Sequence, residues 1–215
     1  MTSQKEVHDF FNKYVFGYMC VDIEREIAIA RSGQLAGNFL CALGLLAYTE
    51  FMGGLLLKEL GSRETGKLFN MFFDYMGTGY KTFREKHDVY SIFRCGLAHE
   101  YFVKHKCTIF MLNISNPTTV LGTISGIGPS LYIPDSTLSP PINIGIGEAP
   151  NGRFFFIVEK YYQDFRSACE QLGEELEKNP KGVFPGFVED WWAFQELEMT
   201  SNETLHNTDM KRIQD

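Results

Sequence analysis

The first part of the chain repeats its apolar positions with the period of an amphipathic helix. Ser3 followed three residues later by Glu6 forms a capping-box pattern, which predicts that a helix begins here. A further helical stripe runs over residues 22–31, with Gly33 after it as a stop signal. Residues 39–57 are then almost continuously apolar, which predicts a helix that is buried on most of its sides.

Glycines divide the next helical stretch. The apolar helix is expected to end at Gly61, after which Ser62 is a candidate cap for a helix rich in phenylalanine. Gly77 and Gly79 interrupt that helix, and another begins near Asp88. The pattern therefore predicts an almost entirely helical first hundred residues.

The middle of the chain follows a different pattern. Residues 107–113 are an apolar run typical of a short strand, and residues 122–141 are rich in Gly, Pro, Ser and Thr, which predicts a loop. Residues 142–147 and 153–158 flank an Asn-Gly pair, the usual sequence of a β-hairpin turn. We therefore expect β-structure between two helical parts.

The predicted organisation is a mainly α bundle with a small insertion that contains a β-hairpin. The helical core spans residues 1–106, the insertion spans 107–158, and the helices of 159–199 complete the core. Residues 200–215 are polar and show no periodic apolar positions, so we expect a disordered tail. The apolar positions of the long helix after 159 are Tyr162, Phe165, Cys169, Leu172 and Leu176.

Composition narrows the class of protein. With 215 residues and 44% hydrophobic content, the chain can bury a core without disulfides or metals. Its five scattered cysteines and the absence of a signal peptide favour a reduced, cytoplasmic protein. A net charge of −7 argues against non-specific nucleic-acid binding, so any RNA contact needs a local basic site. Candidates for that site are Arg94, Lys104 and Lys106.

The apolar helix of residues 39–57 is long enough to span a bilayer, but it carries a carboxylate. Glu50 near its middle and Gly53-Gly54 near its end favour a helix in a protein core over a membrane span. A buried carboxylate needs a partner, which Arg94 or Arg25 could supply. The simplest expectation is a structural ion pair, and a role of Glu50 in chemistry is the alternative.

The helix after Asp88 carries the most informative residues, because Arg94, His99 and Tyr101 are spaced Arg-x4-His-x-Tyr. Histidine both takes and gives a proton near neutral pH, and arginine holds a phosphate oxygen while negative charge develops. These groups suffice for phosphodiester cleavage without a metal or cofactor. On an α-helix Tyr101 shares the face of Arg94, whereas His99 lies about 140° away.

This motif resembles the signature of the HEPN superfamily (higher eukaryote and prokaryote nucleotide-binding). In that superfamily Arg-x4-6-His lies on a helix, and members that keep it are typically RNA-cutting enzymes. The trailing His-x-Tyr is similar to the subset found as toxins beside a minimal nucleotidyltransferase. The resemblance implies a HEPN-like helical bundle and a metal-independent endoribonuclease. It also implies a homodimer in which two copies of His99 and Arg94 converge on one RNA phosphate.

The same resemblance suggests how the protein would be used and controlled. A toxin acting in phage defence or plasmid maintenance is the family expectation. A nucleotide attached to Tyr101 by a partner nucleotidyltransferase would place a phosphate beside Arg94 and switch the enzyme off. The alternative is a Tyr101 whose ring packs in an interface.

Two features keep other functions open. Active family members commonly have Asn, Asp or His after the motif arginine, where this chain has Cys95, a weaker hydrogen-bonding group. There are therefore two alternatives. One is a catalytically weak HEPN module that binds RNA or a protein partner, and the other is a purely structural helical dimer. Cys95, His99, His105 and Cys107 could also bind zinc, although their spacing matches no standard finger or ribbon.

Overall fold

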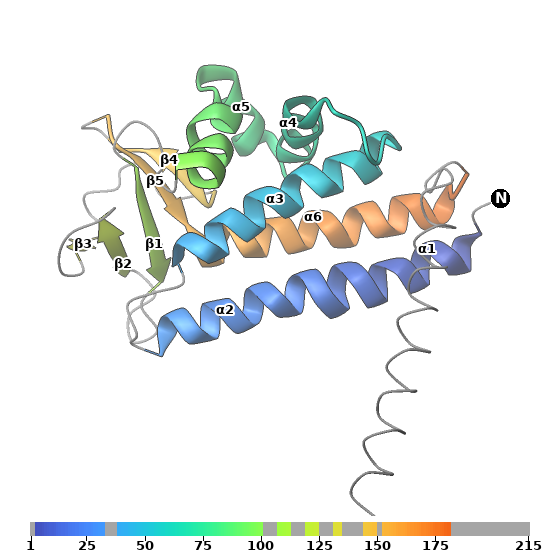
Figure 1. Cartoon of the computed structure of the whole chain (residues 1–215), viewed down its shortest axis with the longest axis horizontal. Helices are drawn as coiled ribbons and strands as arrows, with labels where there is room; N and C mark the ends of the chain where they lie inside the picture. Colours follow the sequence, from blue (N-terminus) through green and yellow to red (C-terminus); the bar gives the residue numbers. More distant parts are fainter. Residues whose placement is uncertain are drawn as a thin grey trace, which may run out of the picture.

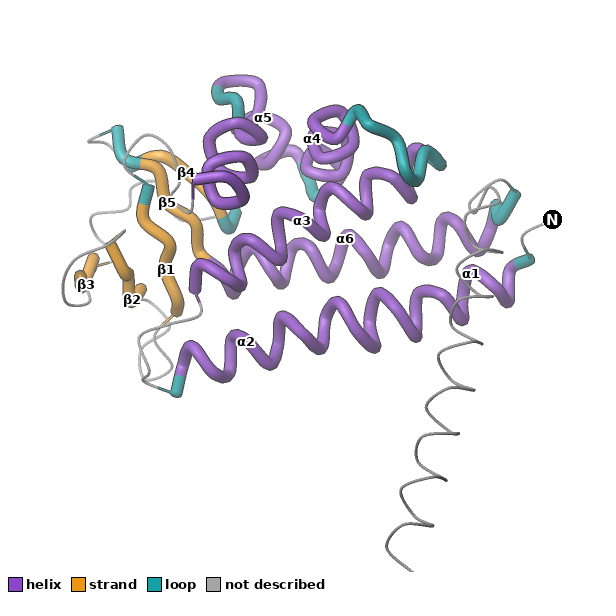
Figure 2. Tube along the Cα trace, viewed as in Figure 1, coloured by secondary structure: helices purple, strands orange, loops and turns teal. Residues whose placement is uncertain are grey.

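The computed structural model of the chain (Figure 1) describes residues 3–32, 38–100, 107–112, 119–124, 131–134, 144–149 and 152–181. Within these ranges the protein is mainly helical, with a small mixed β-sheet at one end of the helices (Figure 2). The prediction of a mainly helical protein with a small β-containing part is confirmed. The helix expected within residues 183–199 and the tail of residues 200–215 lie outside the described residues.

The chain starts with one long helical rod, seen in blue in Figure 1. It consists of α1 (Gln4–Phe10), a π-helix η1 (Phe11–Cys20) and α2 (Val21–Arg31), which follow one another without a break. The predicted capping box is present, because the Ser3 and Glu6 side chains each accept the backbone N–H of the other residue.

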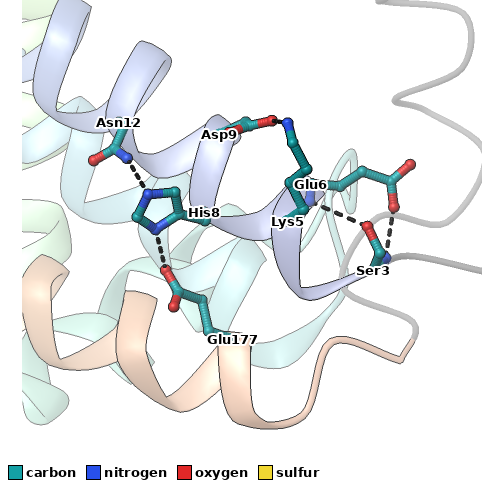
Figure 3. Close-up of polar contacts among 7 residues, drawn as sticks. All are labelled: Ser3, Lys5, Glu6, His8, Asp9, Asn12 and Glu177. Atoms are coloured by element: carbon teal, nitrogen blue, oxygen red, sulfur yellow. Dashed lines mark hydrogen bonds and ion pairs between the residues drawn. The ribbon is translucent and has the colours of Figure 1, made fainter.

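A contact between side chains joins this rod to Glu177, near the end of the last described helix (Figure 3). His8 lies between Asn12 and Glu177, and its two ring nitrogens are 2.8 Å from Asn12 Nδ2 and 2.9 Å from Glu177 Oε1. A carboxylate only accepts hydrogen bonds and an amide nitrogen only donates them, so Glu177 accepts from Nδ1–H and Asn12 Nδ2 donates to Nε2.

Four helical elements follow the rod: α3 (Asn38–Leu57), α4 (Thr65–Tyr75), α5 (Thr78–Lys86) and a second π-helix, η2 (Tyr90–Glu100). The prediction that Ser62 caps α4 is wrong. Its hydroxyl accepts the N–H of Glu64 at 3.2 Å, in the turn before the helix. Helix α5 was not predicted from the sequence, because Gly77 and Gly79 were taken only as a break in the preceding helix.

Helix α3 is the centre of the bundle and packs against α2, α4, α6 and η2. In the described part of the chain it is the one helix long and apolar enough to cross a membrane, and half of its residues are buried against these neighbours. Its closest approach is to α4, since a Cβ added at Gly53 would lie 1.8 Å from the backbone oxygen of Leu68. Only glycine permits this contact.

The sheet contains β1 (Thr108–Leu112), β2 (Thr119–Ile124), β3 (Leu131–Pro134), β4 (Ile146–Glu148) and β5 (Phe154–Ile157). Its strand order is β3-β2-β1-β5-β4, and β1 pairs with β5 in parallel while the other pairs are antiparallel. The predicted strand and hairpin are confirmed. The loop predicted for residues 122–141 is wrong in part, because β3 and the end of β2 lie within it. The reason is that β1 and β2 each offer a free edge, and even a segment that contains Gly and Thr can pair with such an edge.

The last described helix, α6 (Val158–Lys178), begins directly after β5 and runs beside α1 and α3. Its predicted apolar positions are all buried. Ile109 and Phe156 of the sheet belong to the same hydrophobic cluster as Phe165 of α6. The sheet is therefore packed into the helical core.

Candidate functional site

The site predicted from the motif is centred on an ion pair between η2 and α3. Arg94 Nε donates to Glu50 Oε2 at 3.0 Å, and the two side chains are 20% and 16% exposed. The sequence-based expectation that the carboxylate of the apolar helix needs a cationic partner is confirmed. Arg25, the other candidate, lies 3.5 Å from Asp22 in an exposed pair on its own helix instead.

One turn before Arg94, Tyr90 fixes the start of η2 against α4. Its hydroxyl shares a hydrogen bond of 2.7 Å with Thr65 Oγ1, and its ring lies 5.5 Å from the ring of Phe69. A Cβ at Gly66 would come within 3.3 Å of the Tyr90 ring, so the helix leaves just enough room for it. Nothing in the sequence pattern predicts this contact, because it depends on how α4 packs against η2.

Burial raises the pKa of Tyr90 above its ordinary value, and neighbouring charges act on the same hydroxyl. The charge of Glu50 raises this pKa further, whereas the hydrogen bond with Thr65 and the charge of Arg94 lower it. The phenol, the guanidinium and the carboxylate are therefore close enough to interact electrostatically.

The π-helical form of η2 changes where His99 lies. A π-helix has i→i+5 hydrogen bonds and more residues per turn than an α-helix, so each residue advances by less than the α-helical angle around the axis. Arg94 and His99, five residues apart, are therefore a little more than one turn apart and closer around the axis than the about 140° expected for an α-helix. His99 is exposed at the end of η2, whereas Arg94 is held against α3.

Cys95, which follows Arg94 in the motif, is a free and partly exposed thiol. It follows Arg94 directly on η2, so the two side chains leave the helix in different directions. The other predicted site residues, Tyr101, Lys104 and Lys106, lie outside the described residues.

The cysteines and histidines near the motif are the candidate metal ligands of the chain. Among the residues that the structure describes, no group of three or more His, Cys, Asp or Glu side chains is arranged to hold a metal ion. Burial raises the pKa of Cys107 well above its ordinary value, and its Sγ donates to the oxygen of Thr108. Such a thiol resists forming the thiolate that zinc prefers.

A pocket of about 320 Å³ lies where α5 ends and η2 begins, lined in part by Arg84, His87 and Asp88. These three side chains each have a partner within the protein. Arg84 donates from two nitrogens to Asp74, and His87 lies 3.3 Å from Glu148. Asp88 accepts the N–H of Ser91 and so caps the start of η2.

No family model, no curated protein and no solved structure matches the chain. The resemblance to the HEPN superfamily therefore rests on the motif and on the helical fold around it.

Proposed function

We propose that the protein is a metal-independent endoribonuclease of the HEPN type. The observation that carries this proposal is that η2 is a π-helix, in which Arg94 and His99 lie a little more than one turn apart, with the guanidinium bonded to Glu50 and the imidazole exposed. An arginine that can meet a phosphate and a histidine that can exchange a proton are the groups that RNA cleavage requires.

The reaction follows from these two side chains and the 2′-hydroxyl of RNA. A base removes the 2′-hydroxyl proton while that oxygen attacks the adjacent phosphorus. The bond from phosphorus to the 5′-oxygen breaks, and an acid donates a proton to the leaving oxygen. The products are a 2′,3′-cyclic phosphate and a 5′-hydroxyl. Arg94 neutralises the charge that develops on the phosphate.

The acid and the base are two groups, whereas one chain supplies one His99. A two-fold homodimer with its η2 helices face to face would bring two copies of His99 and Arg94 to one phosphate. The dimer is therefore part of the proposal, and RNA is its substrate.

Single-turnover cleavage of a labelled RNA in the presence of EDTA tests this function. We expect cleavage that EDTA does not reduce, with a 2′,3′-cyclic phosphate on the upstream product. The matched control is the same oligonucleotide with 2′-deoxy residues, which should stay intact. Cleavage that stops on metal removal, or that cuts the deoxy strand equally well, would contradict the mechanism.

A second function is favoured by the Arg94–Glu50 ion pair itself. A carboxylate that already neutralises the motif arginine, together with Cys95 in place of a stronger hydrogen-bonding residue, suits a module that binds RNA or a protein partner but cuts poorly. A purely structural helical dimer would neither bind nor cut RNA. RNA binding without turnover in the EDTA experiment would favour the binding module.

The proposed biological role is a toxin or defence protein that acts in the cytoplasm. A partner nucleotidyltransferase would inhibit it through Tyr101. This role follows from the His-x-Tyr spacing in the sequence.

A further inference from the structure

We propose that Glu50 is the positioning residue for Arg94: it holds Nε of the guanidinium and leaves the two terminal nitrogens to bind the RNA phosphate. This inference rests on the proposed function and assigns a role within the same site. Guanidinium groups bind phosphate best through two parallel N–H groups. A side chain fixed at Nε by Glu50 presents its Nη1 and Nη2 pair as that fork.

The surroundings of the pair suit such a role. Glu50 sits on the central helix α3, one helical turn before Gly53, where α4 makes its closest approach. Both partners are less than one quarter exposed, so their attraction is screened less than that of a surface pair. The carboxylate is thus held by a rigid element, and the arginine is fixed against it.

Tyr90 fixes the part of η2 that precedes the arginine. Its hydrogen bond with Thr65 and its ring contact with Phe69 fix the first turn of η2 on α4. Arg94 follows in the next turn and therefore starts from a fixed backbone position. Two helices, α3 through Glu50 and α4 through Tyr90, then determine the direction of the guanidinium.

The pair also sets the charge that RNA meets. Glu50 offsets the positive charge of Arg94, so the parent protein binds the RNA phosphate less tightly than a free guanidinium would. Catalysis then depends more on the orientation of the guanidinium than on its attraction for the phosphate. Removal of the carboxylate charge while an acceptor oxygen is kept should strengthen RNA binding. Removal of the whole carboxyl group should release the guanidinium and lower the cleavage rate.

The experiment compares Glu50→Gln, Glu50→Ala and Glu50→Asp with a matched control, Glu59→Gln. Glu59 is also ion-paired, with Lys67 at 2.9 Å, and its substitution changes the net charge equally away from the site. Affinity for a 2′-O-methyl RNA is measured over a range of salt concentrations. The values of kcat and KM are measured on cleavable RNA, and thermal unfolding checks that each variant is folded.

Glu50→Gln should bind RNA about threefold or more tightly than the parent, with a steeper salt dependence, and its kcat should fall less than that of Glu50→Ala. Glu50→Ala should lower kcat by about tenfold or more. Glu50→Asp keeps the charge but reaches less far, so kcat should fall without tighter binding. If Glu50→Gln destabilises the fold, the Glu50→Asp result decides alone.

Two results would overturn the inference. If the parent cuts RNA but the Glu50 variants match Glu59→Gln in affinity, salt dependence and kcat, the pair is only structural and the proposed function survives. If the parent neither binds nor cuts RNA, the proposed function falls and this inference falls with it.

Discussion

At the scale of single residues, Ser3 and Glu6 fix the start of the first helix (Figure 3). The hydrogen bonds with Ser3 lower the pKa of Glu6 below its ordinary value of 4.5. A lowered pKa means that the folded state favours the carboxylate. Its contribution is therefore present above pH 4.5 and is lost as the pH falls through the lowered pKa.

We expect Ser3→Ala to cost about 1 kcal/mol of stability at pH 7, because it removes a helix cap. Glu6→Gln should flatten the fall in stability on acidification. The measurement is the free energy of unfolding between pH 7 and pH 3. Glu174→Gln, on the exposed surface of α6, is the control and should keep the slope of the parent. An unchanged slope in Glu6→Gln would refute the role given to this carboxylate.

The proposed control by nucleotidylation also acts at one residue, Tyr101. Tyr101→Phe removes only the hydroxyl to which a nucleotide could be attached. The variant should cut RNA like the parent and should resist a co-expressed nucleotidyltransferase that silences the parent. Equal silencing of both proteins would show that Tyr101 is not the modified residue.

Some of these residues could be predicted from the sequence and others could not. A cationic partner for Glu50 was predictable because a carboxylate in an apolar helix needs one, but the sequence left Arg94 and Arg25 as alternatives and the structure shows Arg94. The position of His99 was not, because helical periodicity assumes 3.6 residues per turn and nothing in the sequence pattern indicated a π-helix. The contact of Tyr90 with Thr65 depends on tertiary packing and left no signal in the spacing.

At the scale of elements, the contact between α3 and α4 depends on a glycine. Gly53→Ala should destabilise the protein by about 3 kcal/mol or more, because the new Cβ would overlap the Leu68 backbone oxygen and neither backbone can yield easily. The control on the same helix is Gly44→Ala. Its Cβ would lie 3.0 Å from Ile23 Cδ1, the end of a flexible side chain, so the change should stay within about 1 kcal/mol.

Thermal or denaturant unfolding of the two variants measures this difference. Similar stabilities would mean that α3 and α4 do not pack as closely as the structure indicates. The sequence marked Gly53 only as a poor residue for a membrane span. Its role became clear once the partner helix was placed, which the hydrophobic period cannot do.

The same distinction holds for the sheet. The hairpin of β4 and β5 follows from a local turn signal, which the sequence contains. The parallel pairing of β1 with β5 joins segments more than 40 residues apart, and no local pattern encodes it. For that reason the sequence suggested an insertion, whereas the sheet shares its core with α6.

At the scale of the whole molecule, the proposed mechanism requires a dimer. We expect a dimer at micromolar concentration in sedimentation, and a cleavage rate that falls more steeply than protein concentration when the dimer is diluted below its dissociation constant. A monomer that cuts RNA at full rate would rule out a site shared by two copies.

The central claim, that Arg94 and His99 carry out metal-free RNA cleavage, is tested most directly by single-turnover cleavage in EDTA with three variants. His99→Ala and Arg94→Ala should each lower the rate constant by about two to four orders of magnitude while the protein stays folded. His8→Ala, which changes an exposed histidine on α1, should keep the rate of the parent. Undiminished cleavage by His99→Ala would contradict the account.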